Sequence, residues 1–514
     1  MGGIHADSSY CTTHEDLPTA LCIPELVQKI LQYIIDDPDE CWSGRDAERY
    51  KISPSWEDTC TEILTSKNQF FIDPYHENDS YLLEYLDQIH WNYRSFISCL
   101  MHPRMSRTVI NKIGFQLRDL ELRIGKYGTV SDFEDLLQSL SRNCRKLQSF
   151  RILFQDKSII PTGMFSSYQS CKLPIQNLIA DDINNAKQLK FVQRIVETSP
   201  NLLRIKLTSE EIKVVTGILR TIINSPQTMK TLKELHLPKP FLESRNPLLL
   251  NYFMYNSWRL SSLQVSFGES ILLKHIHLLL NSFKETLRSL EITFEDCFLE
   301  PLEYEIEDSR IQDYLIVPMS LNKLQRLVIS HVPSKALALV NALLLPNLSH
   351  FEFLAGECEC NGNQSFQDVW DWAETPVVNL CLEELRLTYV NDVTIFNPIV
   401  SSNPWSNLKN LELSTESAEI VRAVFQNLAN LERFQLFIVE GQQESWMNVF
   451  TGKRKAPVGL GVRFDKASIR SLNKLKWLKI SGSPYSQLIF KDIFISHGLL
   501  HLKELQCVKL QNTD

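Results

Sequence analysis

The sequence predicts an α/β solenoid, a horseshoe whose concave side is a parallel sheet and whose outer side consists of helices. One short phrase occurs fourteen times between Leu117 and Cys507. It consists of an aliphatic residue, two variable residues, an apolar residue, one variable residue and a further apolar residue. Successive phrases start 23 to 44 residues apart, and most steps lie between 23 and 30. A single unit of this kind cannot bury its own apolar face, so a series of them predicts stacked repeats around a continuous core.

The phrases share apolar residues at their first, fourth and sixth positions. They begin at Leu117, Leu147, Ile175, Leu202, Leu232, Leu260, Leu287, Leu324, Leu348, Leu382, Leu408, Leu431, Leu475 and Leu502. This pattern resembles that of leucine-rich repeats, in the long class where a helix follows each strand. The resemblance implies that the apolar residues point into the core. It also implies that the variable residues on either side of the fourth and sixth positions point outward.

The segments between the phrases predict helices on the outer side. Five of them place apolar residues at helical intervals. These segments are 187–200, 212–226, 272–283, 335–346 and 418–429. Several end in Ser-Pro, Pro-Asn or Asn-containing turns, which are typical helix stops.

A different pattern precedes the repeats. Residues 21–35 read LCIPELVQKILQYII, in which Ile23-Pro24-Glu25 forms an entry to a predicted helix. Proline in a first turn loses no hydrogen bond, and the glutamate favours the positive end of a helix. Four apolar residues share one face of this predicted helix: Leu26, Ile30, Leu31 and Ile34.

Together with Ile52-Ser53-Pro54-Ser55-Trp56, this segment resembles an F-box. That pattern opens with Leu/Ile-Pro-Glu and later contains a Val-Cys/Ser-x-x-Trp element, while the polar stretch from Trp42 to Arg49 departs from its leucine-rich second helix. The resemblance implies a small all-α domain that docks on a Skp-type adaptor and, through it, on a cullin. It implies an adaptor-binding role for Pro24, Leu26, Ile30, Leu31, Ile34 and Trp56. The competing interpretation is that residues 21–66 form a helical cap for the first repeat.

These patterns divide the chain into four parts. We expect residues 1–20 to be disordered, 21–67 to form the F-box-like helical domain, 68–116 to form a helical linker or cap, and 117–514 to form a solenoid of about fourteen leucine-rich repeats. In the third part, apolar residues at helical spacing suggest one or two helices: Leu82, Leu83, Leu86, Ile89, Phe96 and Ile97.

The F-box and leucine-rich repeat resemblance implies the substrate-recognition subunit of an SCF-type cullin-RING ubiquitin ligase, whose repeats bind a target protein. The alternative is a non-catalytic leucine-rich repeat scaffold or inhibitor with an amino-terminal helical cap and no ubiquitin link.

Strand alternation predicts which side chains would meet that target. The late repeats place large aromatic and cationic residues at outward positions, a composition typical of interaction hot spots. These candidates are Arg386, Arg433, Phe437, Trp477 and Lys479. In the competing interpretation, the insertion from Glu440 to Arg463 folds over Phe437 and Trp477.

Composition excludes several classes of function. The net charge of −8 opposes general binding to nucleic acid or to a membrane surface, and no stretch approaches eighteen uninterrupted apolar residues. We expect a protein of the cytoplasm or nucleus. Neither a phosphate-binding glycine loop nor a catalytic motif is recognisable, so we expect no enzyme and no cofactor. Cys358 and Cys360 lack a second pair at zinc-like spacing, so we expect no metal site.

Overall fold

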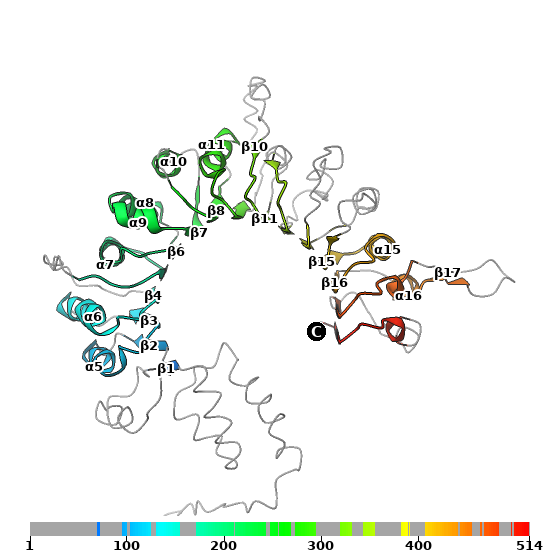
Figure 1. The fold of residues 1–514 in the computed structure, drawn as a ribbon, viewed down its shortest axis with the longest axis horizontal. Helices are drawn as coiled ribbons and strands as arrows, with labels where there is room; N and C mark the ends of the chain where they lie inside the picture. Colours follow the sequence, from blue (N-terminus) through cyan, green and yellow to red (C-terminus); the bar gives the residue numbers. More distant parts are fainter. Residues whose placement is uncertain are drawn as a thin grey trace, which may run out of the picture. The chain divides into compact units, whose positions relative to one another are not determined.

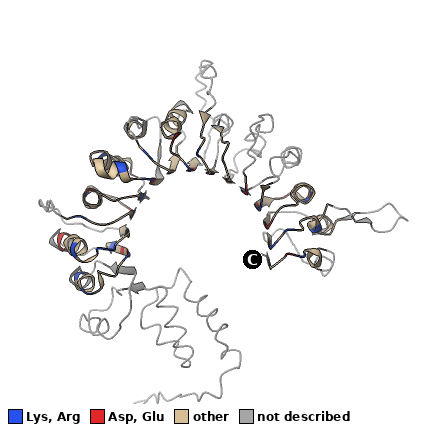
Figure 2. Cartoon of the chain, viewed as in Figure 1, with Lys and Arg blue, Asp and Glu red and all other residues tan. Residues whose placement is uncertain are grey.

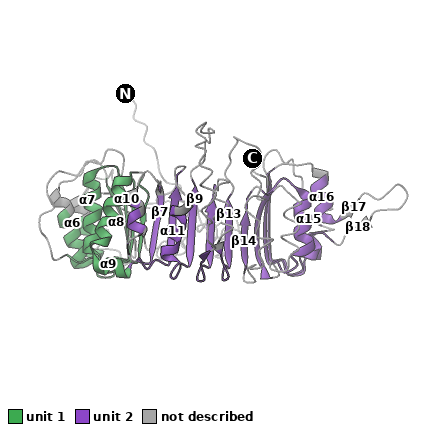
Figure 3. Ribbon diagram, turned by 90° about the horizontal axis from the view of Figure 1, so that it is seen from above, with its two compact units in different colours: residues 1–231 green, residues 232–514 purple. Residues whose placement is uncertain are grey.

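The structure is a computed structural model of the 514-residue chain. It describes residues 69–71, 95–99, 103–124, 130–154, 171–209, 211–242, 247–254, 256, 258–268, 273–294, 319–331, 343–354, 382–388, 390, 407–439, 443–454, 463–464, 467–482, 495 and 498–512. The chain divides into two compact units, residues 1–231 and residues 232–514 (Figure 3).

The first unit contains a parallel sheet whose strand order follows the chain. Its strands are β1 (Gln69–Phe71), β2 (Ser95–Cys99), β3 (Asp119–Ile124), β4 (Ser149–Phe154), β5 (Asn177–Asp181) and β6 (Arg204–Leu207). Core positions align from strand to strand, so that Leu120 pairs with Phe150 and Phe150 with Leu178. Because each strand is parallel to the next, the chain must return between them on one face of the sheet.

Helices make the returns that the structure describes. In the first unit they are α5 (Pro103–Ile113), α6 (Val130–Asn143), α7 (Ala186–Thr198), α8 (Ile212–Ile223) and α9 (Pro226–Thr231), all on the same side of the strands (Figure 1). Helix α8 buries the apolar side chains that its sequence spacing places on one face: Val214, Val215, Ile218, Leu219 and Ile222.

Asn185 determines where helix α7 begins. Its side-chain oxygen accepts hydrogen bonds from the backbone amides of Lys187 at 3.1 Å and Gln188 at 3.0 Å. In return, the Gln188 side chain accepts a hydrogen bond of 2.6 Å from the Asn184 amide. These bonds satisfy first-turn amides that have no acceptor within the helix.

The second unit repeats the same architecture. Its parallel sheet consists of β7 (Glu234–Leu242), β8 (Ser262–Phe267), β9 (Ser289–Phe294), β11 (Arg326–Ser330), β13 (His350–Leu354), β14 (Glu384–Leu387), β15 (Asn410–Thr415), β16 (Arg433–Ile438), β19 (Trp477–Gly482) and β20 (Cys507–Asn512). Helices α10 (Pro247–Met254), α11 (Leu273–Phe283), α15 (Ala418–Asn427) and α16 (Gln443–Thr451) lie on one side of it, with the short 3-10 helices Ile469–Ser471 and Leu499–His501.

Two small pairs of strands supplement this sheet. Strand β10 (Met319–Ser320) pairs in parallel with β12 (Leu343–Leu344), and β17 (Lys453–Arg454) pairs antiparallel with β18 (Arg463–Phe464).

The repeat register predicted from the sequence is confirmed in thirteen phrases. Their first, fourth and sixth residues are all buried, as in Leu117, Leu120 and Leu122 of the first phrase. Even the degraded phrase at Ile175 fits, because Leu178 and Ala180 face the core. The small Ala180 is accommodated because it pairs with the larger Ile152 and Leu207.

The fourteenth phrase was assigned wrongly by three residues. Trp477 pairs with Cys507 and Leu478 with Val508, so the last repeat reads LQCVKL from Leu505 rather than LKELQC from Leu502. Both frames match the phrase in sequence, and pairing with β19 selects between them. The outward position beside Lys479 is consequently occupied by Lys509.

Four of the five connecting segments contain the helix expected of them, namely α7, α8, α11 and α15. The fifth, 335–346, is described only from residue 343, where it forms strand β12. A short leucine run has no periodicity that separates strand from helix, and pairing with β10 determines the outcome.

The segment 68–116, expected to be helical, contains strands β1 and β2 before helix α5. Phe96 and Ile97, assigned to a helix, lie in β2, where Phe96 pairs with Leu120 and Ile97 with Glu121. These strands lack the leucine phrase, so tertiary pairing rather than local pattern places them in the sheet. Residues 1–20 and 21–67 lie outside the described residues.

Candidate functional site

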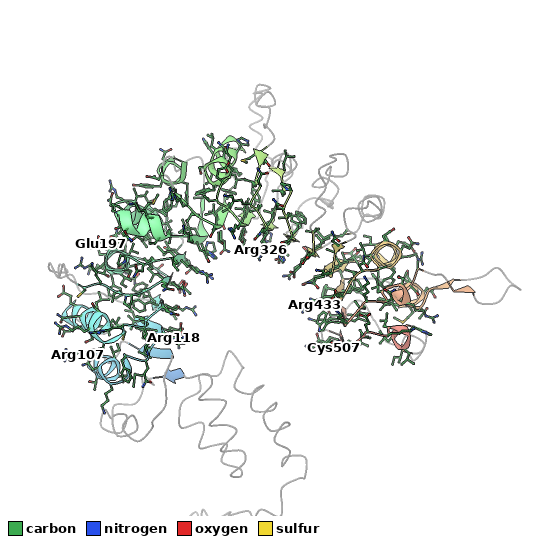
Figure 4. The ribbon with its side chains drawn as sticks, in the orientation of Figure 1. Arg107, Arg118, Glu197, Arg326, Arg433 and Cys507 are labelled. Atoms are coloured by element: carbon green, nitrogen blue, oxygen red, sulfur yellow. The ribbon has the colours of Figure 1, made fainter. Side chains whose placement is uncertain are left out.

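Each sheet has one face that turns away from the helices, called here the open face. On the second unit, strand alternation brings the third and fifth residues of each repeat to this face, and most of them are polar. Figure 4 shows Arg326 and Arg433 on this side of the strands, and Figure 2 shows both charge signs along it.

A ladder of alternating charges crosses the open face of the second unit from β8 to β16. Gln264 donates a 2.6 Å hydrogen bond to Glu291, whose carboxylate lies 3.7 Å from the Arg326 guanidinium. Arg326 also lies 3.7 Å from Glu352, and Glu352 accepts a 2.8 Å hydrogen bond from Arg386. The pattern of opposite charges on successive strands stabilises the sheet.

The ladder continues to β16. Arg386 Nε lies 3.1 Å from the Glu412 carboxylate, and Gln435 donates a 3.1 Å hydrogen bond to the same carboxylate. Arg386, predicted to bind a target, is therefore engaged on both sides by carboxylates of its own sheet. Its role here is structural unless a ligand displaces one of them.

Glu352 is the most buried acid of the ladder, with 12% of its side chain exposed. Interaction with His350 lowers the pKa of the Glu352 carboxyl, burial opposes this shift, and Arg386 and Arg326 lower the pKa further. The same contact with Glu352 raises the pKa of His350, against the opposing effect of burial, and Glu384 at 2.9 Å raises it again. The pair therefore favours a charged imidazolium beside a charged carboxylate.

The composition changes at the carboxyl-terminal end of this face. The Trp477 cluster is defined here as Arg433 on β16, Trp477 and Lys479 on β19, and Lys509 on β20. The Arg433 guanidinium carbon lies 4.1 Å from the centroid of the Trp477 ring, in cation–π contact. By register, Arg433 stands beside Trp477, and Lys479 stands between Gln435 and Lys509.

Three of the five residues predicted to bind a target, Arg433, Trp477 and Lys479, are thus brought together. Phe437 lies on the same strand as Arg433, half-buried and paired with Ser414 and Ser481. Arg386 lies two strands away from β16.

The described part of the insertion 440–463 does not cover this cluster. Its helix α16 packs against α15 on the opposite side of the sheet, where the rings of Phe450 and Phe425 lie 6.1 Å apart. Trp446 stacks on Phe450 at 6.3 Å and is almost fully buried. The strands that follow, β17 and β18, extend outward from that side (Figure 1).

The sequence reasoning overlooked several residues of this face. Arg326, His350 and Glu352 occupy the third and fifth positions of their phrases, so the same alternation rule identifies them. Lys509 was missed for a different reason, since it becomes an outward residue only after the last repeat is shifted to Leu505. All six residues predicted to bind an adaptor lie outside the described residues: Pro24, Leu26, Ile30, Leu31, Ile34 and Trp56.

The open face of the first unit has its own ion pairs. Arg151 contacts Asp181 at 2.9 Å and Glu121 at 3.8 Å, and Arg123 pairs with Glu121 at 2.8 Å. Thr208 donates a 3.0 Å hydrogen bond to the second oxygen of Asp181. The charges of Glu121, Arg123, Arg151 and Asp181 are thus paired within the sheet.

The described ranges contain no group of three or more His, Cys, Asp or Glu that could hold a metal ion. Their helices include none that is long and apolar enough to cross a bilayer. The Cys144 thiol is buried, and burial raises its pKa to about 12, which leaves it protonated and unreactive. Cys358 and Cys360 lie outside these ranges.

No family model and no curated protein matches the sequence. Among solved structures, the chain is similar to the complex of Rad7 and Elc1 in yeast, with 12% identity, a TM-score of 0.40, and coverage of 91% of this chain and 90% of that one. The tropomodulin carboxyl-terminal domain of Caenorhabditis elegans matches with 12% identity and a TM-score of 0.22 over 36% of this chain and 92% of its own. A Bacteroides fragilis protein matches with 14% identity and a TM-score of 0.27 over 48% of this chain and 62% of its own.

Proposed function

We propose that this protein is the substrate-recognition subunit of an SCF-type cullin-RING ubiquitin ligase. The observation on which the proposal rests is the F-box-like segment from Ile23 to Trp56, which precedes a leucine-rich repeat solenoid in the same chain. In this role the amino-terminal segment docks on a Skp-type adaptor, and the open face of the repeats holds the target protein.

The geometry of the second unit supports the binding half of this proposal. The charge ladder fixes the side chains of adjacent strands in defined positions, and a rigid surface loses less conformational entropy when it binds. The Trp477 cluster supplies aromatic and guanidinium groups, which are enriched at the centres of protein interfaces. Such a surface binds without chemistry of its own.

In the proposed complex the chain is not an enzyme. It acts by holding a target's lysines near the ubiquitin-conjugating partner, which raises their local concentration and thereby the rate of transfer. We propose that it works in the cytoplasm or nucleus, without a cofactor, and through protein partners alone.

The adaptor half is tested by capture of a purified Skp-type adaptor on the immobilised full-length chain. Leu26→Asp and Ile30→Asp place a charge on the apolar helix face, so each is expected to abolish capture. Gln28→Asp introduces the same charge on the polar side of the predicted helix and should retain capture. Far-ultraviolet circular dichroism shows whether the solenoid of each variant is intact.

Failure of the unaltered chain to retain the adaptor would overturn the ubiquitin link. So would equal capture by the Leu26→Asp and Gln28→Asp variants. The second candidate, a leucine-rich repeat scaffold or inhibitor with a helical cap at residues 21–66, would then be favoured, because it needs the binding face of the repeats but no adaptor.

A further inference from the structure

Charge alternates along most of the open face of the second unit. Glu291, Arg326, Glu352, Arg386 and Glu412 occupy successive strands from β9 to β15, and each charge lies within 3.7 Å of an opposite one. Over this region the sheet therefore pairs each of these charges with an opposite charge of its own.

This alternation stops at the Trp477 cluster. Among the described residues, no carboxylate forms an ion pair with Arg433, Lys479 or Lys509. Other lysines at this end do have partners: Lys476 lies 2.7 Å from Glu432, and Lys474 donates a 2.8 Å hydrogen bond to Asn430. Among the described residues, the outward cations of β16, β19 and β20 have no acid partner of this kind.

Lys479 and Lys509 are also direct neighbours. They are register partners on β19 and β20, so their backbones lie about 4.8 Å apart. Like charges opposite one another destabilise a sheet, and here the cost is not relieved by an acid on either strand. Two neighbouring lysines without an acid beside them on an open surface are complementary to a ligand that brings negative charge.

We propose that the Trp477 cluster is the docking site of an acidic peptide segment of the target protein. Two carboxylates of the segment replace the missing acids beside Lys479 and Lys509, and Trp477 with Arg433 supplies the adjoining apolar contact. In an extended peptide alternate side chains lie roughly 7 Å apart, a spacing that two flexible lysines on adjacent strands can meet. This inference rests on one part of the proposed function, namely that the repeats bind a target protein.

The charge balance favours a peptide over a nucleic acid. The cationic region is limited to three strands, while the chain as a whole has a net charge of −8. A polyanion would extend over the acids Glu412 on β15 and Glu384 on β14, whereas a short acidic segment contacts the cluster alone.

The test uses the full-length chain without adaptor and a short fluorescein-labelled peptide of alternating glutamate and serine. Fluorescence anisotropy should show binding, and Lys479→Glu or Lys509→Glu should each weaken it about tenfold, since each replaces an attraction by a repulsion. Lys503→Glu is the matched control: it makes the same charge change on the turn before β20 and should alter the affinity by less than about twofold. Salt at about 1 M, where the Debye length is about 3 Å, should abolish binding.

Three results would overturn the proposal. They are equal affinity for a peptide in which glutamine replaces glutamate, equal loss of binding in Lys503→Glu and Lys509→Glu, and tighter binding of single-stranded oligothymidylate that the same cluster variants abolish. Since no adaptor is present, failure here leaves the ubiquitin link untouched. Adaptor capture without peptide binding would reject only this docking site.

Discussion

The guanidinium of Arg433 lies 4.1 Å from the centre of the Trp477 ring on the neighbouring strand, although both residues stand on the open face of the sheet. An arginine in this position is attracted by the negative face of the indole, and the contact holds both side chains in one conformation. Arg433 and Trp477 are therefore held in mutual contact before a ligand arrives.

The Arg433–Trp477 contact should be measurable as a coupling energy. A double-mutant cycle with Arg433→Gln and Trp477→Leu should give about 0.5–1 kcal/mol in the free energy of unfolding, as expected for an exposed cation–π pair. The free energy of unfolding of each variant is obtained from amide exchange in strands β16 and β19, measured at increasing urea concentrations. Additive effects of the two substitutions would mean that the contact contributes nothing.

Relief of the lysine pair should stabilise the isolated protein. Lys509→Glu converts a like-charge neighbour of Lys479 into an opposite-charge pair, which should add about 0.2–1 kcal/mol to the free energy of unfolding. Lys503→Glu, with no outward neighbour on β19, should leave it unchanged. The same Lys509→Glu variant is expected to bind the peptide about tenfold more weakly. Stability and affinity should therefore move in opposite directions, and a parallel change would contradict this account.

The extent to which sequence predicted this molecule differs between the core and the surface. The core positions of stacked repeats, such as Leu120, Phe150 and Leu178, were predictable because each repeat buries an apolar residue at the same position of its phrase. Strands β1 and β2 were not, because only pairing with β3 places them in the sheet. A residue that faces outward is predictable by alternation, but its ion-pair partners depend on several strands at once.

Arg386 and Lys509 illustrate that limit. Arg386 has the appearance of a free binding residue in the sequence, yet Glu352 and Glu412 from two other repeats neutralise it. Lys509 has no such signal, since a three-residue ambiguity in the final phrase conceals its position. Register across strands determines both outcomes, and register is a property of the folded sheet.

Two glycines should respond in opposite ways to the same substitution. A Cβ at Gly114 would lie 2.3 Å from the backbone oxygen of Ile110 and 2.9 Å from Cys144 Sγ, so Gly114→Ala must shift backbone and should cost about 1–3 kcal/mol. A Cβ at Gly217, within helix α8, meets the end of the Leu189 side chain at 3.0 Å. That side chain can move, and alanine favours the helix by up to about 1 kcal/mol, so Gly217→Ala should be neutral or stabilising. Urea midpoints of the two variants compare them directly, and equal destabilisation would contradict the prediction.

Protonation of His350 should stabilise β13 and β14 within a limited pH range. Because the pKa of His350 is raised above its usual 6.5, its contribution is fully present below that value and is lost as pH rises through the raised pKa. Because the pKa of Glu352 is lowered from 4.5, its contribution is present above 4.5 and is lost only as pH falls further.

Amide exchange provides a local measurement of this effect. After correction for intrinsic rates, peptides covering β13 and β14 should exchange more slowly at about pH 6 than at about pH 8, since His350 is more fully protonated at the lower pH while Glu352 is charged at both. His350→Gln keeps a hydrogen-bonding side chain but cannot take up the proton, so it should remove the difference. Strand β6 in the first unit, whose sequence RIKL contains neither histidine nor a carboxylate, provides the internal reference. If the pH dependence of β13 persisted in His350→Gln, the stabilisation would have to come from another group, because Arg326 and Arg386 remain charged throughout this range.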